Sequence, residues 1–210
     1  TQVQAIDAFA TDIVNDYGRY TCACAMLETA ERLAGEERAP VPDLHRLTVA
    51  ALRAVADGSR PRELVLDSYL LRAMAIAGWA PALIECARCA TPGPHRAFHI
   101  AAGGSVCVHC RPSGSATPPQ GVLDLMAALH DGDWQHAQSA PQSYRSQASG
   151  LVAAHLQWHL ERQLRTLPLV ERVYRVDRTV AEQRVALVGQ DMAHGVEAGQ
   201  GEIPTAAPGA

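Results

Sequence analysis

The sequence predicts a mainly α-helical protein, a helical bundle with a small four-cysteine module inserted between its two halves. Three observations support this fold class. Apolar residues recur at steps of three and four along much of the chain, which is typical of amphipathic helices. Two Cys-x2-Cys pairs interrupt that periodicity. Hydrophobic residues make up 48% of the 210 residues, which is enough to bury a core.

The first block of the bundle is expected over residues 10–85, and its first helix over residues 10–36. The apolar residues of this helix share one face, which we expect to be buried against the other helices. The stripe consists of Ile13, Tyr17, Tyr20, Cys24 and Leu27.

Two more helices complete the first block. The second is expected over residues 43–57, with Asp43 as its N-cap and Gly58 just beyond its end. The third begins near Pro61, a residue favoured in a first helical turn, and ends at Gly78. Their apolar stripes are Leu44, Leu47, Ala51, Leu52 and Val55, and Leu66, Tyr69, Leu70, Ala73 and Ala77.

The second block of the bundle is expected over residues 112–178. It follows a Pro-, Gly- and Ser-rich loop at residues 111–120. Helical periodicity returns over residues 121–130 and again over residues 146–166, and Pro168 ends the last helix. The stripes are Val122, Leu125, Met126 and Leu129, and Leu151, Val152, His155, Leu156, His159, Leu160 and Leu164.

The two ends of the chain are expected to lie outside the bundle. Residues 1–9 contain a short alternation that suits one strand, and the partners of such a strand would have to precede Thr1. Residues 179–210 are rich in Gly, Ala, Gln and Pro, which predicts a flexible tail. No apolar run reaches the roughly 18 residues of a membrane span, and no secretory leader is expected.

The motif that indicates chemistry is C-x2-C-x17-C-x2-C, within a module expected over residues 86–111. Two residues between cysteines allow a tight turn to direct both sulfurs at one metal ion, and two such turns complete a tetrahedron at about 2.3 Å from zinc. The intervening hairpin, with Gly103-Gly104 as its turn, is too small to bury a core, so metal binding would stabilise it. The predicted zinc ligands are Cys86, Cys89, Cys107 and Cys110.

Two other uses of these cysteines remain open. Two disulfides would suit an oxidising compartment, and a redox pair would suit a thioredoxin-like fold, for which the sequence shows no βαβ pattern. Structural Zn²⁺ is the favoured interpretation. Four sulfur ligands leave no open coordination position, so the metal is not expected to be catalytic. Cys22 and Cys24 lie two positions apart on a helix and cannot face one site.

Three arginines of the module, Arg88, Arg96 and Arg111, have no acidic neighbours in sequence within residues 86–111. They are candidates for contact with nucleic-acid phosphates, and the alternative is that they offset thiolate charge by donating N–H bonds to sulfur. His155 and His159 have a spacing that suits a metal, but without a neighbouring Glu they more simply form a histidine pair on a packed helix.

Composition excludes several other functions. The net charge of −4 argues against a bulk polycation, and an aromatic content of 5% is too low for both a core and a base-stacking platform. No phosphate-binding loop, nucleophile elbow or other catalytic constellation is present, so the protein is not expected to be an enzyme.

The order of these elements resembles that of the RecO family of bacterial recombination mediators. The shared features are a helical bundle, an inserted CxxC…CxxC module, and a closing helix with the sequence WHLERQLR at residues 158–165. The opening Ile6-Asp-Ala-Phe9 looks like the exit from the last strand of the N-terminal barrel of that family. The resemblance covers about residues 1–175.

The resemblance implies an N-terminal OB barrel that this chain lacks, and a function without catalysis. RecO proteins bind single- and double-stranded DNA, anneal complementary strands and help to load RecA onto DNA coated by single-stranded-DNA-binding protein. They also bind RecR and the C-terminal tail of single-stranded-DNA-binding protein. A cytoplasmic, nucleoid-associated location is implied, and no membrane partner. The alternative is a zinc-ribbon adaptor that binds other proteins but not DNA.

Overall fold

The protein is described by a computed structural model, which defines residues 9–35, 41–160 and 164–170. All of these belong to one unit, residues 1–172. The expectations for the first eight residues and for the tail at residues 179–210 lie outside the described part. The helices are α1 (Ala10–Val14), α2 (Tyr17–Ala34), α3 (Pro42–Asp57), α4 (Arg62–Ile76), α5 (Gln120–Asp131), α6 (Trp134–Ser139) and α7 (Gln142–Leu160).

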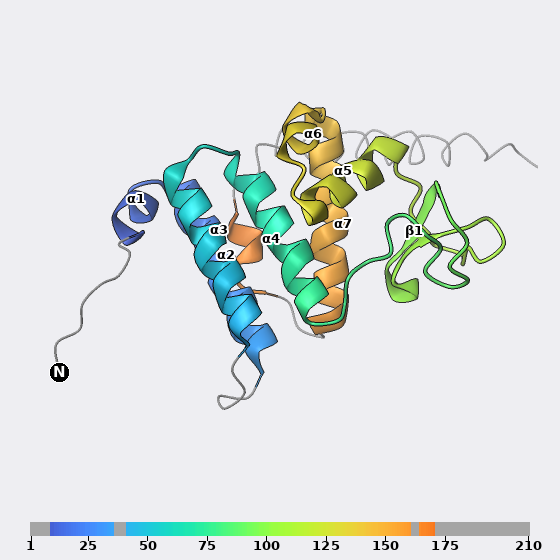
Figure 1. Cartoon of the computed structure of the whole chain (residues 1–210), viewed down its shortest axis with the longest axis horizontal. Coiled ribbons are helices and arrows are strands. Elements are labelled where there is room, and N and C mark those ends of the chain that lie inside the picture. The colour runs from blue at the N-terminus through green and yellow to red at the C-terminus, as the bar shows by residue number, and fades with distance from the viewer. Residues whose placement is uncertain (1–8, 36–40, 161–163, 171–210) are drawn as a thin grey trace, which may run out of the picture. The chain divides into compact units, whose positions relative to one another are not determined.

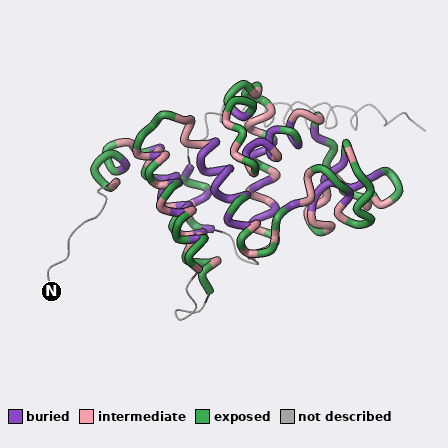
Figure 2. The backbone as a smooth tube through the Cα atoms, viewed as in Figure 1, coloured by how far each residue is buried: buried purple, intermediate pink, exposed green. Residues whose placement is uncertain are grey.

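Helix α4 is the centre of the bundle and contacts α2, α3, α5 and α7 (Figure 1). It is buried nearly all round rather than along the single predicted stripe (Figure 2). Two of its buried hydroxyls are satisfied inside the core, since that of Tyr69 donates to the carbonyl of Met26 at 3.0 Å and that of Ser68 donates to the carbonyl of Leu129 at 2.7 Å. The predicted mainly helical fold is confirmed, with α4 as its common packing partner.

The predicted continuous helix over residues 10–36 is wrong, because the chain breaks at Asp16. This residue is extended, and its carboxylate accepts the backbone N–H of Arg19 at 3.0 Å, so it caps the start of α2. The predicted buried face is also wrong for α2. Its stripe residues Tyr17, Tyr20 and Leu27 are 58%, 47% and 51% exposed.

The face of α2 that is buried carries small and polar residues. Cys22, Ala25 and Met26 are fully enclosed there, together with two threonines. The hydroxyls of Thr21 and Thr29 donate to backbone carbonyls one turn earlier, at 3.1 and 2.7 Å. Bonding to their own helix removes the cost of burying these hydroxyls, so the two threonines can share a closely packed face of α2 with Cys22, Ala25 and Met26.

The boundaries of other helices also differ from prediction. Asp43 is not the N-cap of α3 but lies in its first turn, where it pairs with Arg46. Helix α6 was not predicted, and α7 begins earlier than expected. In the described part α7 ends at Leu160, and the chain re-enters the core through a short 3-10 turn at Leu167–Leu169.

The inserted module lies in sequence between α4 and α5. Strands β1 (Ala97–His99) and β2 (Gly104–Val106) form an antiparallel pair, joined by a 3-10 turn at Ile100–Ala102. The turn of the hairpin therefore lies at residues 100–103, and Gly104, which was expected in the turn, is the first residue of β2. Gly104 adopts a φ of +139° against the backbone of Ala82, and an added Cβ would collide with that backbone. The small hairpin therefore depends on a glycine at this position.

None of the helices in the described ranges is both long and apolar enough to cross a membrane.

Candidate metal centre

Both cysteine pairs lie in tight turns at one end of the module. Residues 87–89 and 108–110 form the turns that follow Cys86 and Cys107. The first turn is closed by the N–H of Ala90, which donates to the carbonyl of Cys86 at 2.8 Å. The second is closed by the N–H of Cys110, which donates to the carbonyl of Cys107 at 3.2 Å. Each turn therefore directs two sulfur atoms toward the same side.

The four predicted ligands converge on one point. Their sulfur atoms all lie within 4.8 Å of one another, although the two pairs are separated by seventeen residues in sequence. The Sγ atoms of Cys89 and Cys107 are 3.8 Å apart. This distance equals the edge of about 3.8 Å expected for a tetrahedron with metal–sulfur bonds of about 2.3 Å. The described cysteines form no disulfide, so the cluster has the geometry of a metal site.

Backbone amides stabilise negative charge on the buried sulfur of the cluster. The N–H of Cys107 donates to the Sγ of Cys86 at 3.4 Å, and the N–H groups of Arg88 and Cys89 also point at this atom. These bonds, against the opposing effect of burial, lower the pKa of Cys86 to about 6. Cys86 is therefore prepared to act as a thiolate ligand before any metal arrives.

A cation is needed for all four sulfurs to be ionised together. Contact with the sulfurs of Cys89 and Cys107 raises the pKa of Cys110 to about 12. Four thiolates at this spacing repel one another strongly, and a divalent ion removes that repulsion by bonding all of them. The donor set fits Zn²⁺, which favours four-coordinate thiolate sites. The cluster could therefore hold a metal ion that supports the module.

The three arginines of the module lie on its surface. The side chains of Arg88, Arg96 and Arg111 are exposed, and within the described residues they form no hydrogen bond or ion pair. The sulfur of Cys86 accepts backbone amides rather than guanidinium groups. Phosphate contact by these arginines stays a prediction.

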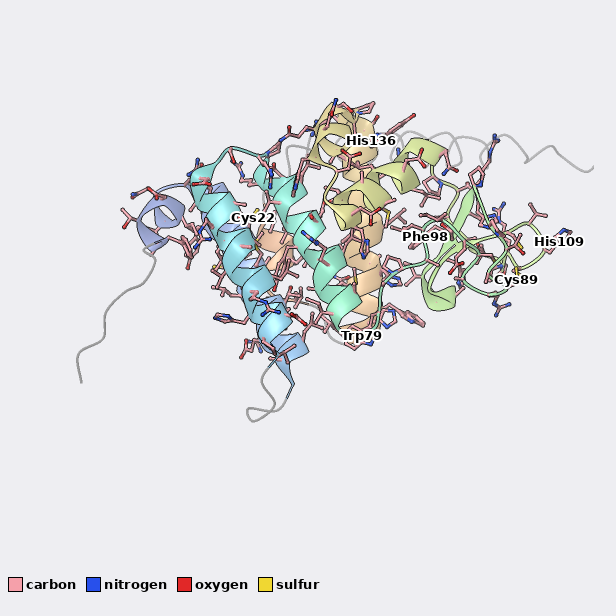
Figure 3. The ribbon with its side chains drawn as sticks, in the orientation of Figure 1. Cys22, Trp79, Cys89, Phe98, His109 and His136 are labelled. Atoms are coloured by element: carbon pink, nitrogen blue, oxygen red, sulfur yellow. The ribbon has the colours of Figure 1, made fainter. Side chains whose placement is uncertain are left out.

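Figure 3 shows Cys89 and the exposed His109 at the end of the module that is farthest from the helices.

The opposite end of the module is fixed to the bundle by an aromatic cluster that the sequence did not predict. Phe98 on β1 is buried and packs edge-on against His155 of α7, with ring centroids 6.1 Å apart. His155 also hydrogen-bonds to the carbonyl of Trp79 at 3.0 Å through its Nε2 atom. The Trp79 ring stacks on His159 at 5.2 Å. The histidine pair therefore joins three segments, which agrees with its interpretation as a pair on a packed helix.

The resemblance proposed from the sequence is supported by a family model described as "Recombination protein O C terminal", which matches residues 14–168. The match covers more than half of the chain and includes the helical bundle, the four cysteines and the start of the last segment. The chain therefore belongs to the RecO family of DNA recombination and repair proteins, of which it carries the C-terminal region.

Proposed function

We propose that this chain is the helical and zinc-binding body of a recombination mediator that works without catalysing a reaction. The mediator would bind single- and double-stranded DNA, anneal complementary strands and help to load RecA onto DNA coated by single-stranded-DNA-binding protein. The observation that carries the proposal is the family match across residues 14–168, which includes a convergent four-cysteine cluster. The protein would carry out these steps in the cytoplasm, in association with the nucleoid.

Zinc has a structural role in this proposal. Cys86, Cys89, Cys107 and Cys110 would bind one Zn²⁺ and leave no position for a reacting molecule. The metal would hold the two cysteine turns together and so support the hairpin between them. The exposed Arg88, Arg96 and Arg111 would then be presented to phosphates on a rigid surface.

Two protein partners complete the proposal, RecR and the C-terminal tail of single-stranded-DNA-binding protein. Because that tail ends in a hydrophobic residue with a free carboxylate, its site needs an apolar hollow beside an arginine. A hollow of about 480 Å³ between the hairpin and α7 offers the apolar part, with Phe98, Leu151 and Trp158 among its lining. None of the described residues that line it is an arginine.

The proposal is tested by strand annealing and DNA binding of the full-length protein across salt concentrations. The Arg88, Arg96 and Arg111 triple variant to Gln should bind DNA more weakly on every sequence, with a shallower salt dependence, because phosphate contacts carry no sequence information. The matched control replaces the exposed Arg32, Arg46 and Arg72 by Gln and should have little effect.

Absence of annealing and of salt-dependent DNA binding in the wild-type protein would remove the mediator function and leave the adaptor alternative. Normal binding by the triple variant would instead show that these three arginines face solvent only.

A further inference from the structure

The turn between α3 and α4 gathers three guanidinium groups around one hollow of about 400 Å³, away from the cysteine module in sequence. Arg19 comes from α2, Arg60 from the turn and Arg62 from the first position of α4. We call this group the arginine turn. Neither the zinc site nor the family resemblance accounts for three cations at one place in the acidic first block of the chain.

Two glycines leave space for two of these side chains. An added Cβ at Gly18 would collide with the guanidinium of Arg62, and one at Gly58 would collide with that of Arg19. Arg19 is further fixed by donating to the carbonyl of Ala56 at 2.7 Å. The guanidinium groups therefore occupy defined positions over bare backbone, which lowers the entropy lost when they bind a ligand.

Most of the N–H donors of Arg60 and Arg62 are not used within the described residues. Arg60 lies over the ring of Trp134, 4.2 Å from its centroid, and donates no hydrogen bond to them. Arg62 places its Nε atom 3.3 Å from a carboxylate oxygen of Glu63 and its Nη1 atom 3.9 Å from one of Asp16, and it donates to no other group of the described residues. The hollow thus has an excess of donors over acceptors.

Charge in the hollow also favours an anion. Three arginines face two carboxylates, those of Asp16 and Glu63, so the lining carries a net charge of +1. The pKa of Asp16 is lowered, first by the Arg19 amide and, against burial, also by Arg62, so this carboxylate stays ionised and competes with any incoming anion. The first turn of α4 adds backbone N–H groups that no side chain caps.

We propose that the arginine turn binds a phosphodiester of the nucleic-acid backbone. The inference rests on the proposed function and extends it, because it adds a contact on the helical block to those expected on the zinc module. Planar guanidinium forks suit phosphate oxygens, and Trp134 holds the fork of Arg60 in place. The competing explanation is an internal ion-pair network that only joins α2 to α4.

Two variants of the full-length protein separate these explanations. Arg60→Gln leaves both carboxylate contacts of Arg62 intact, and it should weaken binding of a labelled DNA oligonucleotide and reduce the salt slope by about 1. Asp16→Asn keeps a capping side chain but removes the competing charge, so it should tighten DNA binding by about threefold or more. Arg46→Gln is the control, since Arg46 pairs with Asp43 on an exposed face of α3.

A second measurement is independent of DNA. Inorganic phosphate, titrated into the protein, should shift the side-chain N–H resonances of Arg60 and Arg62 in nuclear magnetic resonance spectra, more strongly in Asp16→Asn. If the protein binds no DNA but phosphate shifts these signals, the mediator function fails while the phosphate site stands. If DNA binds but Arg60→Gln behaves like Arg46→Gln and phosphate shifts nothing, the arginine turn is not a phosphate site. A gain of affinity in Asp16→Asn together with phosphate-induced shifts at Arg60 and Arg62 would not be produced by a purely structural network.

Discussion

His155 joins the cysteine module to the bundle and is enclosed almost completely, with 1% of its surface exposed. Burial is the main reason that its pKa lies below the ordinary 6.5, since the bond to the Trp79 carbonyl acts in the opposite direction and the nearby His159 lowers it further. The neutral ring with its proton on Nε2 suits this environment because it donates to that carbonyl.

Stability should therefore fall when His155 is forced to take up a proton. The unfolded chain binds this proton near pH 6.5, and the folded chain binds it only at lower pH. The contribution of neutral His155 to the free energy of unfolding is therefore complete above about pH 6.5 and is lost as the pH falls below that value. His155→Gln should reduce the loss of unfolding free energy between pH 7 and pH 5, measured by chemical denaturation. The exposed His136, replaced by Gln, is the control and should leave the slope unchanged. If the free energy of unfolding of His155→Gln fell between pH 7 and pH 5 as steeply as that of the wild type, this assignment to His155 would be contradicted.

Individual residues differ in how far the sequence reveals their role. The four cysteines could be found from spacing alone, because each Cys-x2-Cys turn is a local structure whose geometry two intervening residues determine. The partners of His155 could not, since Trp79 lies 76 positions away in sequence and Phe98 belongs to another element. The arginine turn was missed for the same reason, because Arg19 and Arg62 meet only after α2 packs against α4.

At the scale of elements, Glu28 on α2 holds the segment that follows α7. Its carboxylate accepts the backbone N–H groups of Arg165 and Thr166, each at 2.9 Å, and the Thr166 hydroxyl at 2.5 Å. Burial alone would raise the pKa of Glu28, but these donors outweigh it and the pKa is lowered. One charged side chain thus substitutes for helix hydrogen bonds where the last segment turns back to the core.

Replacing Glu28 by Gln should destabilise this contact. A neutral amide has a single acceptor oxygen for three donors, so the free energy of unfolding should fall by about 1–3 kcal/mol. The backbone amide of Thr166 should exchange its hydrogen faster in the variant. Glu31→Gln, one turn further along the exposed side of α2, is the matched control. Equal exchange at Thr166 in the two variants would show that Glu28 does not hold the segment.

The C-terminal ends of α3 and α4 were more predictable than helix starts or helix faces. Gly58 and Gly78 adopt φ values of +67° and +79°, which glycine accepts more readily than other residues, and both stop helices where the sequence indicates. The buried face of α2 was not predictable from hydropathy, because Thr21 and Thr29 satisfy their hydroxyls within the helix. Tyr17 and Tyr20 are apolar enough to be predicted as buried, yet both rings are exposed.

At the scale of the molecule, the described residues contain two kinds of core. The bundle buries a large set of apolar side chains that extends from α2 to the final 3-10 turn and includes Phe98 of the hairpin. The cysteine end of the module has only a small cluster, in which two of the four buried residues are Cys86 and Cys107. So small an apolar cluster cannot stabilise the turns around it, whereas a structural zinc supplies roughly 10–16 kcal/mol in small modules.

The most direct test of the account is the zinc content of the protein. Native mass spectrometry of metal-replete, reduced protein should show one zinc ion per chain in the wild type and in Cys24→Ser, which changes a cysteine outside the cluster. Cys89→Ser should lose most of that zinc, because three thiolates bind it less tightly than four. Wild-type protein without zinc, or Cys89→Ser with a full equivalent, would contradict the assignment of the four cysteines as one metal site.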